Sequence, residues 1–140
     1  MFGLFKKKPP EISAQQTVND ADALEALLSI QLLLARRTKQ DLLSRNFTHG
    51  YFIGACDALS RARRVPDDQY QVYLMGLCIA IFPRHPETFS AAFQLKNELH
   101  FAAGQQRGGQ ETLDVLSKKI VMGTGLIDYF RDQDLHTNKP

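Results

Sequence analysis

The chain has 140 residues, a net charge of +2 and an apolar fraction of 44%. This length suits a single domain with a sizeable core, and the small net charge does not point to a nucleic-acid-binding protein. No uncharged apolar run reaches the ~18 residues that predict a membrane-spanning helix, and no signal peptide is recognisable. Apolar residues recur at helical spacing and do not alternate as they do in strands, so the sequence predicts an all-α fold.

Residues 1–18 are expected to form a flexible N-terminal tail. Its apolar start followed by lysines is typical of a short segment that contacts an anionic membrane surface transiently. The alternative is a disordered tail that only keeps the protein in solution. Phe2 excludes N-myristoylation, which requires glycine at this position. The residues expected to contact the membrane are Phe2, Leu4, Phe5, Lys6, Lys7 and Lys8.

A first helix is predicted over residues 20–45, with acidic residues near its start and arginines near its end, as the helix dipole favours. Its apolar residues cover about three sides of the helix, which is more than a small domain is expected to enclose. A leftover apolar face of this kind indicates an interface with a protein partner or a second copy of the chain. The residues expected at this interface are Leu27, Ile30, Leu33 and Leu34.

The next two helices are predicted over residues 48–64 and 67–82. Gly50 and Gly54 are small enough to permit close helix contact in the former, although glycine weakens a helix by ~1 kcal/mol relative to alanine. The latter is apolar all round from Val72 onward. A helix without a polar face must be covered by protein, so residues 67–82 are predicted to lie at the centre of the fold.

Two further helices are predicted over residues 86–103 and 110–132. The intervening residues 104–109 are rich in Gly and Gln and predict a loop. The glycines at 123 and 125 predict a kink in the last helix, and residues 135–140 are expected to fray. The sequence thus predicts a single-domain five-helix bundle or orthogonal array over residues 19–134, around the helix of residues 67–82.

The chain offers few residues for chemistry. Cys56 and Cys78 lie in apolar patterns, which predicts buried thiols in a reducing compartment. No sequence motif predicts a cofactor, a metal ion or a catalytic nucleophile. Lys96 and His100 share a face of the helix predicted over residues 86–103, so they are the candidates for a small-molecule pocket or an enzyme site. The simpler interpretation is a lysine extending along an apolar edge and a histidine bonded to a neighbouring helix.

Positive charge is concentrated between residues 35 and 64, where seven Lys and Arg against two acidic residues give +5. One interpretation is an anion-binding face for nucleic acid or acidic lipid. The other is that these cations complement the dipoles at the ends of two helices. In an antiparallel helix pair they would form two patches at opposite ends. The candidate anion-binding residues are Arg36, Arg37, Lys39, Arg61, Arg63 and Arg64.

Together these patterns favour a non-catalytic interaction module, such as an adaptor, a chaperone-like protein or a regulatory subunit. It would dock a protein partner or its own copy, as a homo-oligomer, through the apolar face of residues 20–45. A cytoplasmic protein is expected, with a bacterial-like N-terminus that can touch the inner face of a membrane. Two alternatives stay open: the anion-binding module, and a small-molecule pocket or enzyme around His100 and Lys96.

Overall fold

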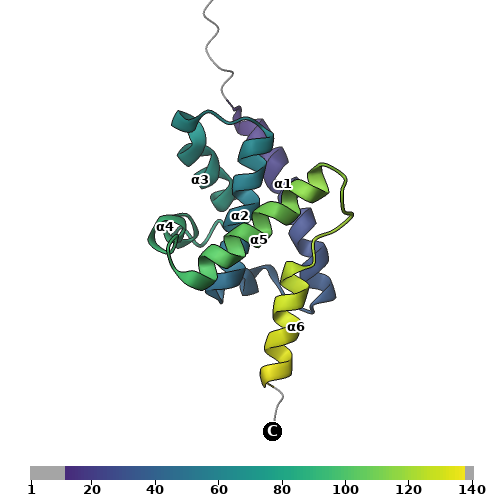
Figure 1. Cartoon of the computed structure of the whole chain (residues 1–140). Helices are drawn as coiled ribbons and strands as arrows, with labels where there is room; N and C mark the ends of the chain where they lie inside the picture. The colour runs from purple at the N-terminus through teal and green to yellow at the C-terminus, as the bar shows by residue number, and fades with distance from the viewer. Residues whose placement is uncertain (1–11, 138–140) are drawn as a thin grey trace, which may run out of the picture.

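The computed structural model describes residues 12–137, and this part of the chain folds into helices without any strand (Figure 1). The predicted all-α class is confirmed, with six α-helices in the described part where five were expected. Two short 3₁₀ helices, η2 (Lys39–Leu43) and η3 (Asp67–Gln69), join some of them. The α-helices are α1 (Ala14–Leu34), α2 (Asn46–Ala62), α3 (Tyr70–Ile81), α4 (Glu87–Gln94), α5 (Leu99–Leu116) and α6 (Gly125–Thr137).

The most enclosed helix is α2, not the helix predicted over residues 67–82. Every residue from 48 to 60 is buried except Asp57, which is partly buried. α3 is covered only on the side that carries Leu74, Leu77 and Ile81. The prediction that residues 67–82 lie at the centre is therefore wrong, because this short helix packs one face on the core and leaves its other apolar face exposed.

α2 and α5 cross with their backbones in direct contact (Figure 1). A Cβ atom added at Gly54 would lie 2.0 Å from the carbonyl oxygen of Gln105, and one added at Gly108 would lie 2.1 Å from that of Tyr51. Only glycine permits so close an approach, so the expected close helix contact of α2 is confirmed. The glycines that make the crossing are Gly50 and Gly54 on α2, and Gly104 and Gly108 on α5.

The glycine-rich residues 104–109 lie inside α5, so the predicted loop is wrong. Low helix propensity made a loop the simpler prediction, but the contact with α2 selects glycine at these positions. The break in this region comes earlier, at residues 95–98, where a single helix over 86–103 was expected. Glu98 then begins α5, since its carboxylate accepts the backbone N–H of Phe101 at 2.7 Å.

Within residues 12–137, three helices end at a residue with left-handed backbone that is not glycine. Arg36 (φ 58°), Arg64 (φ 55°) and Lys118 (φ 63°) follow α1, α2 and α5. The residue after each bonds back into its helix; Arg37 N–H, for example, donates to Leu32 O at 2.8 Å. These are Schellman motifs, which usually carry glycine. α1 therefore ends at Leu34, not at residue 45, and α5 ends at Leu116, inside the helix predicted over 110–132.

The ends of the described part are more helical than predicted. Ser13 caps α1 because its Oγ accepts the backbone N–H of Gln16 at 3.0 Å, so residues 14–18 are helix where a flexible tail was expected. α6 likewise includes residues 135–137, which were expected to fray. The rest of the predicted tail, 1–11, and the last three residues lie outside the described residues.

Candidate docking surface

The four residues predicted at an interface lie on the C-terminal half of α1, and three of them are exposed. Leu33 is 78% exposed and Leu34 59%, Ile30 is about half exposed, and Leu27 is partly buried. The opposite side of the same turns packs into the core through Leu28 and Leu32. This half of α1 is thus apolar on both sides, and only one side is covered by the described residues.

The connection between α5 and α6 extends this apolar surface. Val121 is 96% exposed, and it lines a shallow hollow together with Leu27 and Ile30. The cavity volume of about 20 Å³ is close to that of a single water molecule, so the hollow does not suit a metabolite. We call this the α1–loop surface, and it consists of Leu27, Ile30, Leu33, Leu34, Val115, Val121 and Met122.

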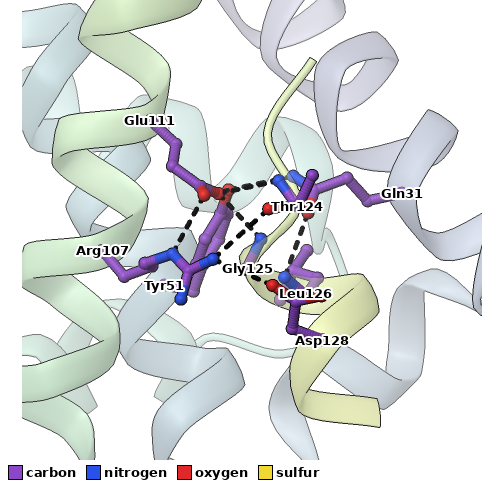
Figure 2. A network of polar contacts seen from close by, with 8 residues as sticks. All are labelled: Gln31, Tyr51, Arg107, Glu111, Thr124, Gly125, Leu126 and Asp128. Atoms are coloured by element: carbon purple, nitrogen blue, oxygen red, sulfur yellow. Dashed lines mark hydrogen bonds and ion pairs between the residues drawn. The ribbon is translucent and has the colours of Figure 1, made fainter. Parts of the chain in front are cut away.

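A network of polar side chains fixes the loop beneath this surface (Figure 2). One oxygen of the Glu111 carboxylate accepts three hydrogen bonds: from the Tyr51 hydroxyl at 2.5 Å, from Gly125 N–H at 2.9 Å and from Thr124 N–H at 3.1 Å. The Glu111 side chain of α5 therefore accepts backbone N–H groups at the start of α6, which have no partner within that helix.

Gln31 of α1 completes the same network. Its amide oxygen accepts Leu126 N–H at 3.0 Å, and its amide nitrogen donates to the Tyr51 hydroxyl at 2.9 Å. Burial and the neighbouring Glu111 carboxylate raise the pKa of Tyr51, so it stays a neutral donor. The effect is to join α1, α2, α5 and the start of α6 through hydrogen-bonded groups, which fixes the end of the loop at Thr124 and Gly125.

Arg107 balances the charge of the network at the protein surface. Its guanidinium pairs with Glu111 at 2.9 Å and with Asp128 at 3.1 Å. Arg107 and Glu111 stand one turn apart on α5, whereas Asp128 comes from α6. The two acidic residues and the arginine thus form an ion-pair chain that holds α6 against α5.

Because of the Glu111 carboxylate, we expect the protein to lose stability in acid. Burial raises the pKa of Glu111, but the hydrogen bonds it accepts outweigh burial, and its pKa lies below the ordinary value. Its contribution to stability is therefore fully present above the unfolded-state pKa of ~4.3 and is lost as pH falls through the lower folded-state pKa. We expect Glu111→Gln to lose less stability than the wild type between about pH 6 and about pH 3, measured by urea unfolding. Equal losses in the two proteins would contradict this role.

Half of the candidate anion-binding residues are engaged in ion pairs within the molecule. Arg37 pairs with Asp134, Lys39 pairs with Glu25, and Arg63 pairs with the buried carboxylate of Asp20. The other three, Arg36, Arg61 and Arg64, are exposed.

The same cations do not form one face. Arg36 follows the end of α1, whereas Arg63 reaches Asp20 in the second turn of that helix. About 20 Å of α1 separates the two groups. Among residues 12–137, these candidate cations therefore lie in two separated groups.

Lys96 and His100 do not share a helix face, because the chain breaks between α4 and α5. Lys96 lies exposed in the connection, and His100 lies exposed in the first turn of α5. His100 lines an open cleft of about 500 Å³, and Lys96 does not. The other lining residues are Ser44, Arg45, Asn46, Phe47, Tyr129 and Gln133.

Both cysteines are buried free thiols in the described part of the chain. Burial raises the pKa of Cys56 and raises that of Cys78 to about 12, so neither is activated as a nucleophile. Within residues 12–137, no group of three metal-ligand side chains could hold an ion, and no helix is long and apolar enough to cross a membrane. The proposed membrane contact at Phe2, Leu4, Phe5 and Lys6–Lys8 lies outside the described residues.

No family model matches the chain, and no curated protein or solved structure is significantly similar to it. Evidence on function therefore comes from the surface and contacts of the molecule.

The sequence analysis does not predict that the α5–α6 connection forms part of the α1–loop surface. It also does not predict the network of Gln31, Tyr51 and Glu111. The sequence predicts one continuous helix over residues 110–132, with Gly123 and Gly125 at a kink within it. A usable signal was present in the segment Lys118–Met122, where two lysines precede three apolar residues. Such a segment is atypical of the middle of an amphipathic helix.

Proposed function

We propose that the protein is a non-catalytic interaction module that docks a partner protein on the α1–loop surface. The observation that carries the proposal is the exposure of large apolar side chains from two elements, with Leu33 at 78% and Val121 at 96%. Scattered exposed leucines are common, but an apolar face that spans a helix and a neighbouring loop is typical of an interface. α1 carries no charged residue between Ala26 and Ala35, as the centre of an interface requires.

The surroundings of this surface suggest the chemistry of the partner. Lys118 and Lys119 are exposed beside the loop, and Arg36 is exposed at the end of α1. None of these three cations forms an ion pair with another described residue. An amphipathic helix with an apolar face and acidic residues along its edges would complement such a surface.

The polar network beneath the loop supports the same proposal. A loop whose end is already fixed loses less conformational entropy when it binds a partner. Glu111 and Gln31 hold the start of α6, and the chain leading to it carries Val121 and Met122 into the surface. We include a cytoplasmic location in the proposal, because two free thiols suit a reducing compartment.

Replacing Leu33 and Leu34 together by glutamate tests the proposal. Both side chains are exposed, so we expect the free energy of unfolding to change by less than about 1 kcal/mol. A partner that co-purifies with the wild-type protein from lysate of its host should be lost, because two charges are placed at the centre of an apolar contact. Affinity capture followed by mass spectrometry measures the loss.

Leu99→Glu is the matched control, since Leu99 is 77% exposed on α5 and lies outside the α1–loop surface. It should retain the partner. If Leu33→Glu/Leu34→Glu unfolds, these residues belong to the core and the proposal is wrong. Equal capture by both variants would also reject it.

A further inference from the structure

The outer face of α3 is a second exposed apolar surface, separate from the α1–loop surface. Val72 is 74% exposed, Ile79 54% and Met75 41%. Their spacing of three and four residues puts them in one stripe along the helix. The neighbouring exposed residues of the same helix are Gln71 and Ala80, so the whole outer face is uncharged.

Nothing in the described part of the chain covers this stripe. The opposite side of α3 packs on the core through Tyr73, Leu74, Leu77, Cys78 and Ile81. α3 thus has apolar residues all round but is enclosed on one side only. A helix of this composition is stable in water when a second apolar surface covers its outer side.

The charges at the two ends of α3 indicate what covers it. Asp67 and Asp68 stand three and two residues before the first residue of the helix, and Arg84 stands three residues after its last. All three are exposed, and none forms an ion pair with another described residue. Asp68 also lies beside the stripe, since it lines one hollow together with Val72.

We propose that a second copy of this chain covers the stripe, with its α3 running antiparallel across a two-fold axis near Met75. In this arrangement Val72 of one copy lies opposite Ile79 of the other. The same register places the acidic residues before α3 opposite Arg84 of the partner copy, because Asp67 stands as far from the midpoint between Val72 and Ile79 as Arg84 does, and Asp68 stands one residue nearer. A two-fold interface requires this kind of self-complementarity.

The charge pattern also selects the direction of the pair. A parallel pair would bring Asp68 against Asp68 at one end and Arg84 against Arg84 at the other, and like charges repel. The antiparallel pair replaces both repulsions with attractions. Since the stripe belongs to one helix of 12 residues, the contact is small and the dimer is expected to dissociate in the micromolar range, on the order of 1–100 μM.

This inference does not depend on the proposed partner surface. Figure 1 shows α3 and the α5–α6 connection on opposite sides of the molecule. Dimer formation through α3 therefore leaves the α1–loop surface open and would present two copies of it. Either proposal can fail without the other.

Sedimentation equilibrium over a range of concentrations measures the dimer directly. We expect the wild-type chain to dimerise and Val72→Glu/Ile79→Glu to stay a folded monomer, with its fold checked by circular dichroism. Leu33→Glu/Leu34→Glu and Leu99→Glu should dimerise like the wild type. A wild-type chain that remains monomeric at millimolar concentration would overturn the proposal, and so would a dimer that is lost only with the Leu33→Glu/Leu34→Glu variant.

A charge exchange tests the antiparallel register without altering the apolar stripe. Asp68→Arg alone and Arg84→Asp alone should each raise the dissociation constant by roughly 2- to 30-fold, because each places like charges opposite one another twice per dimer. The combined Asp68→Arg/Arg84→Asp variant restores opposite charges and should dimerise about as well as the wild type. Additive weakening in the combined variant would overturn the antiparallel arrangement.

Disulfide trapping provides a second measurement of direction. A Val72→Cys chain mixed with an Ile79→Cys chain should form a mixed disulfide rapidly, whereas either chain alone should not. Cys56 and Cys78 are buried and do not interfere. Rapid trapping of Val72→Cys with itself would indicate a parallel pair and contradict the proposal.

Discussion

Replacing Gly54 or Gly108 by alanine is expected to lower the free energy of unfolding by about 3 kcal/mol or more. The new Cβ atom would lie 2.0 Å or 2.1 Å from a backbone carbonyl oxygen of the facing helix. Ordinary contact distances are ~3.5–4.0 Å, so α2 and α5 would have to move apart along their whole crossing. Because α2 is the most enclosed helix, this movement would open gaps throughout the core.

Gly109→Ala is the matched control for this prediction. A Cβ atom there would lie 3.3 Å from its nearest neighbour, the carbonyl oxygen of Gly54. The small crowding is offset by the better helix propensity of alanine, ~1 kcal/mol, so we expect stability within about 1 kcal/mol of the wild type. Urea unfolding of the three variants makes the comparison. If Gly54→Ala and Gly108→Ala are as stable as Gly109→Ala, the close crossing of α2 and α5 is wrong.

The second large effect is expected at Glu111. Glu111→Ala leaves the backbone N–H groups of Thr124 and Gly125, and the Tyr51 hydroxyl, without their acceptor. Each unsatisfied polar group costs about 1–3 kcal/mol when it stays buried. Water can reach part of this site, so we expect a loss of about 3 kcal/mol in the free energy of unfolding. Amide exchange should quicken most in α6 and in the connection before it.

Glu98→Ala serves as the control, because Glu98 caps its own helix, α5, by accepting the Phe101 N–H. Loss of a local cap costs about 1 kcal/mol. Glu98→Ala should therefore destabilise less than Glu111→Ala and should leave exchange in α6 unchanged. Similar effects of the two variants would show that Glu111 does not join α5 to α6.

The sequence predicts the helical class because apolar residues recur at helical spacing over most of the chain. It does not predict where α1 and α5 end. Arg36 and Lys118 adopt the left-handed conformation that usually identifies glycine at a helix end. A charged residue there carries no signal in the sequence, so the first predicted helix ends about three turns beyond the end of α1.

The course of α5 was mistaken for a related reason. Gly104 and Gly108 weaken a helix when considered alone, but packing against α2 outweighs that weakness. The four-residue spacing of glycines in both helices was the available signal. Contacts between distant segments can override the helix propensity of a segment. The sequence of that segment alone does not reveal such contacts.

The candidate surface was only partly predictable. Leu33 and Leu34 could be identified because α1 is apolar on more sides than a small domain can cover. Val121 could not be placed beside them, because its neighbourhood depends on the bonds from Gln31 and Glu111 to the start of α6. The exposed stripe of α3 could not be predicted either, because a helix with apolar residues all round is expected to be buried on every side.

Site-specific photo-crosslinking in the host cell tests the docking proposal most directly. A photoreactive amino acid is placed at residue 33 or 121 on the α1–loop surface, and at Leu99 as an exposed apolar control. We expect one discrete protein adduct from both surface positions and none from the control. An adduct with the same yield at all three positions, or no adduct at residues 33 and 121, would contradict docking at the α1–loop surface.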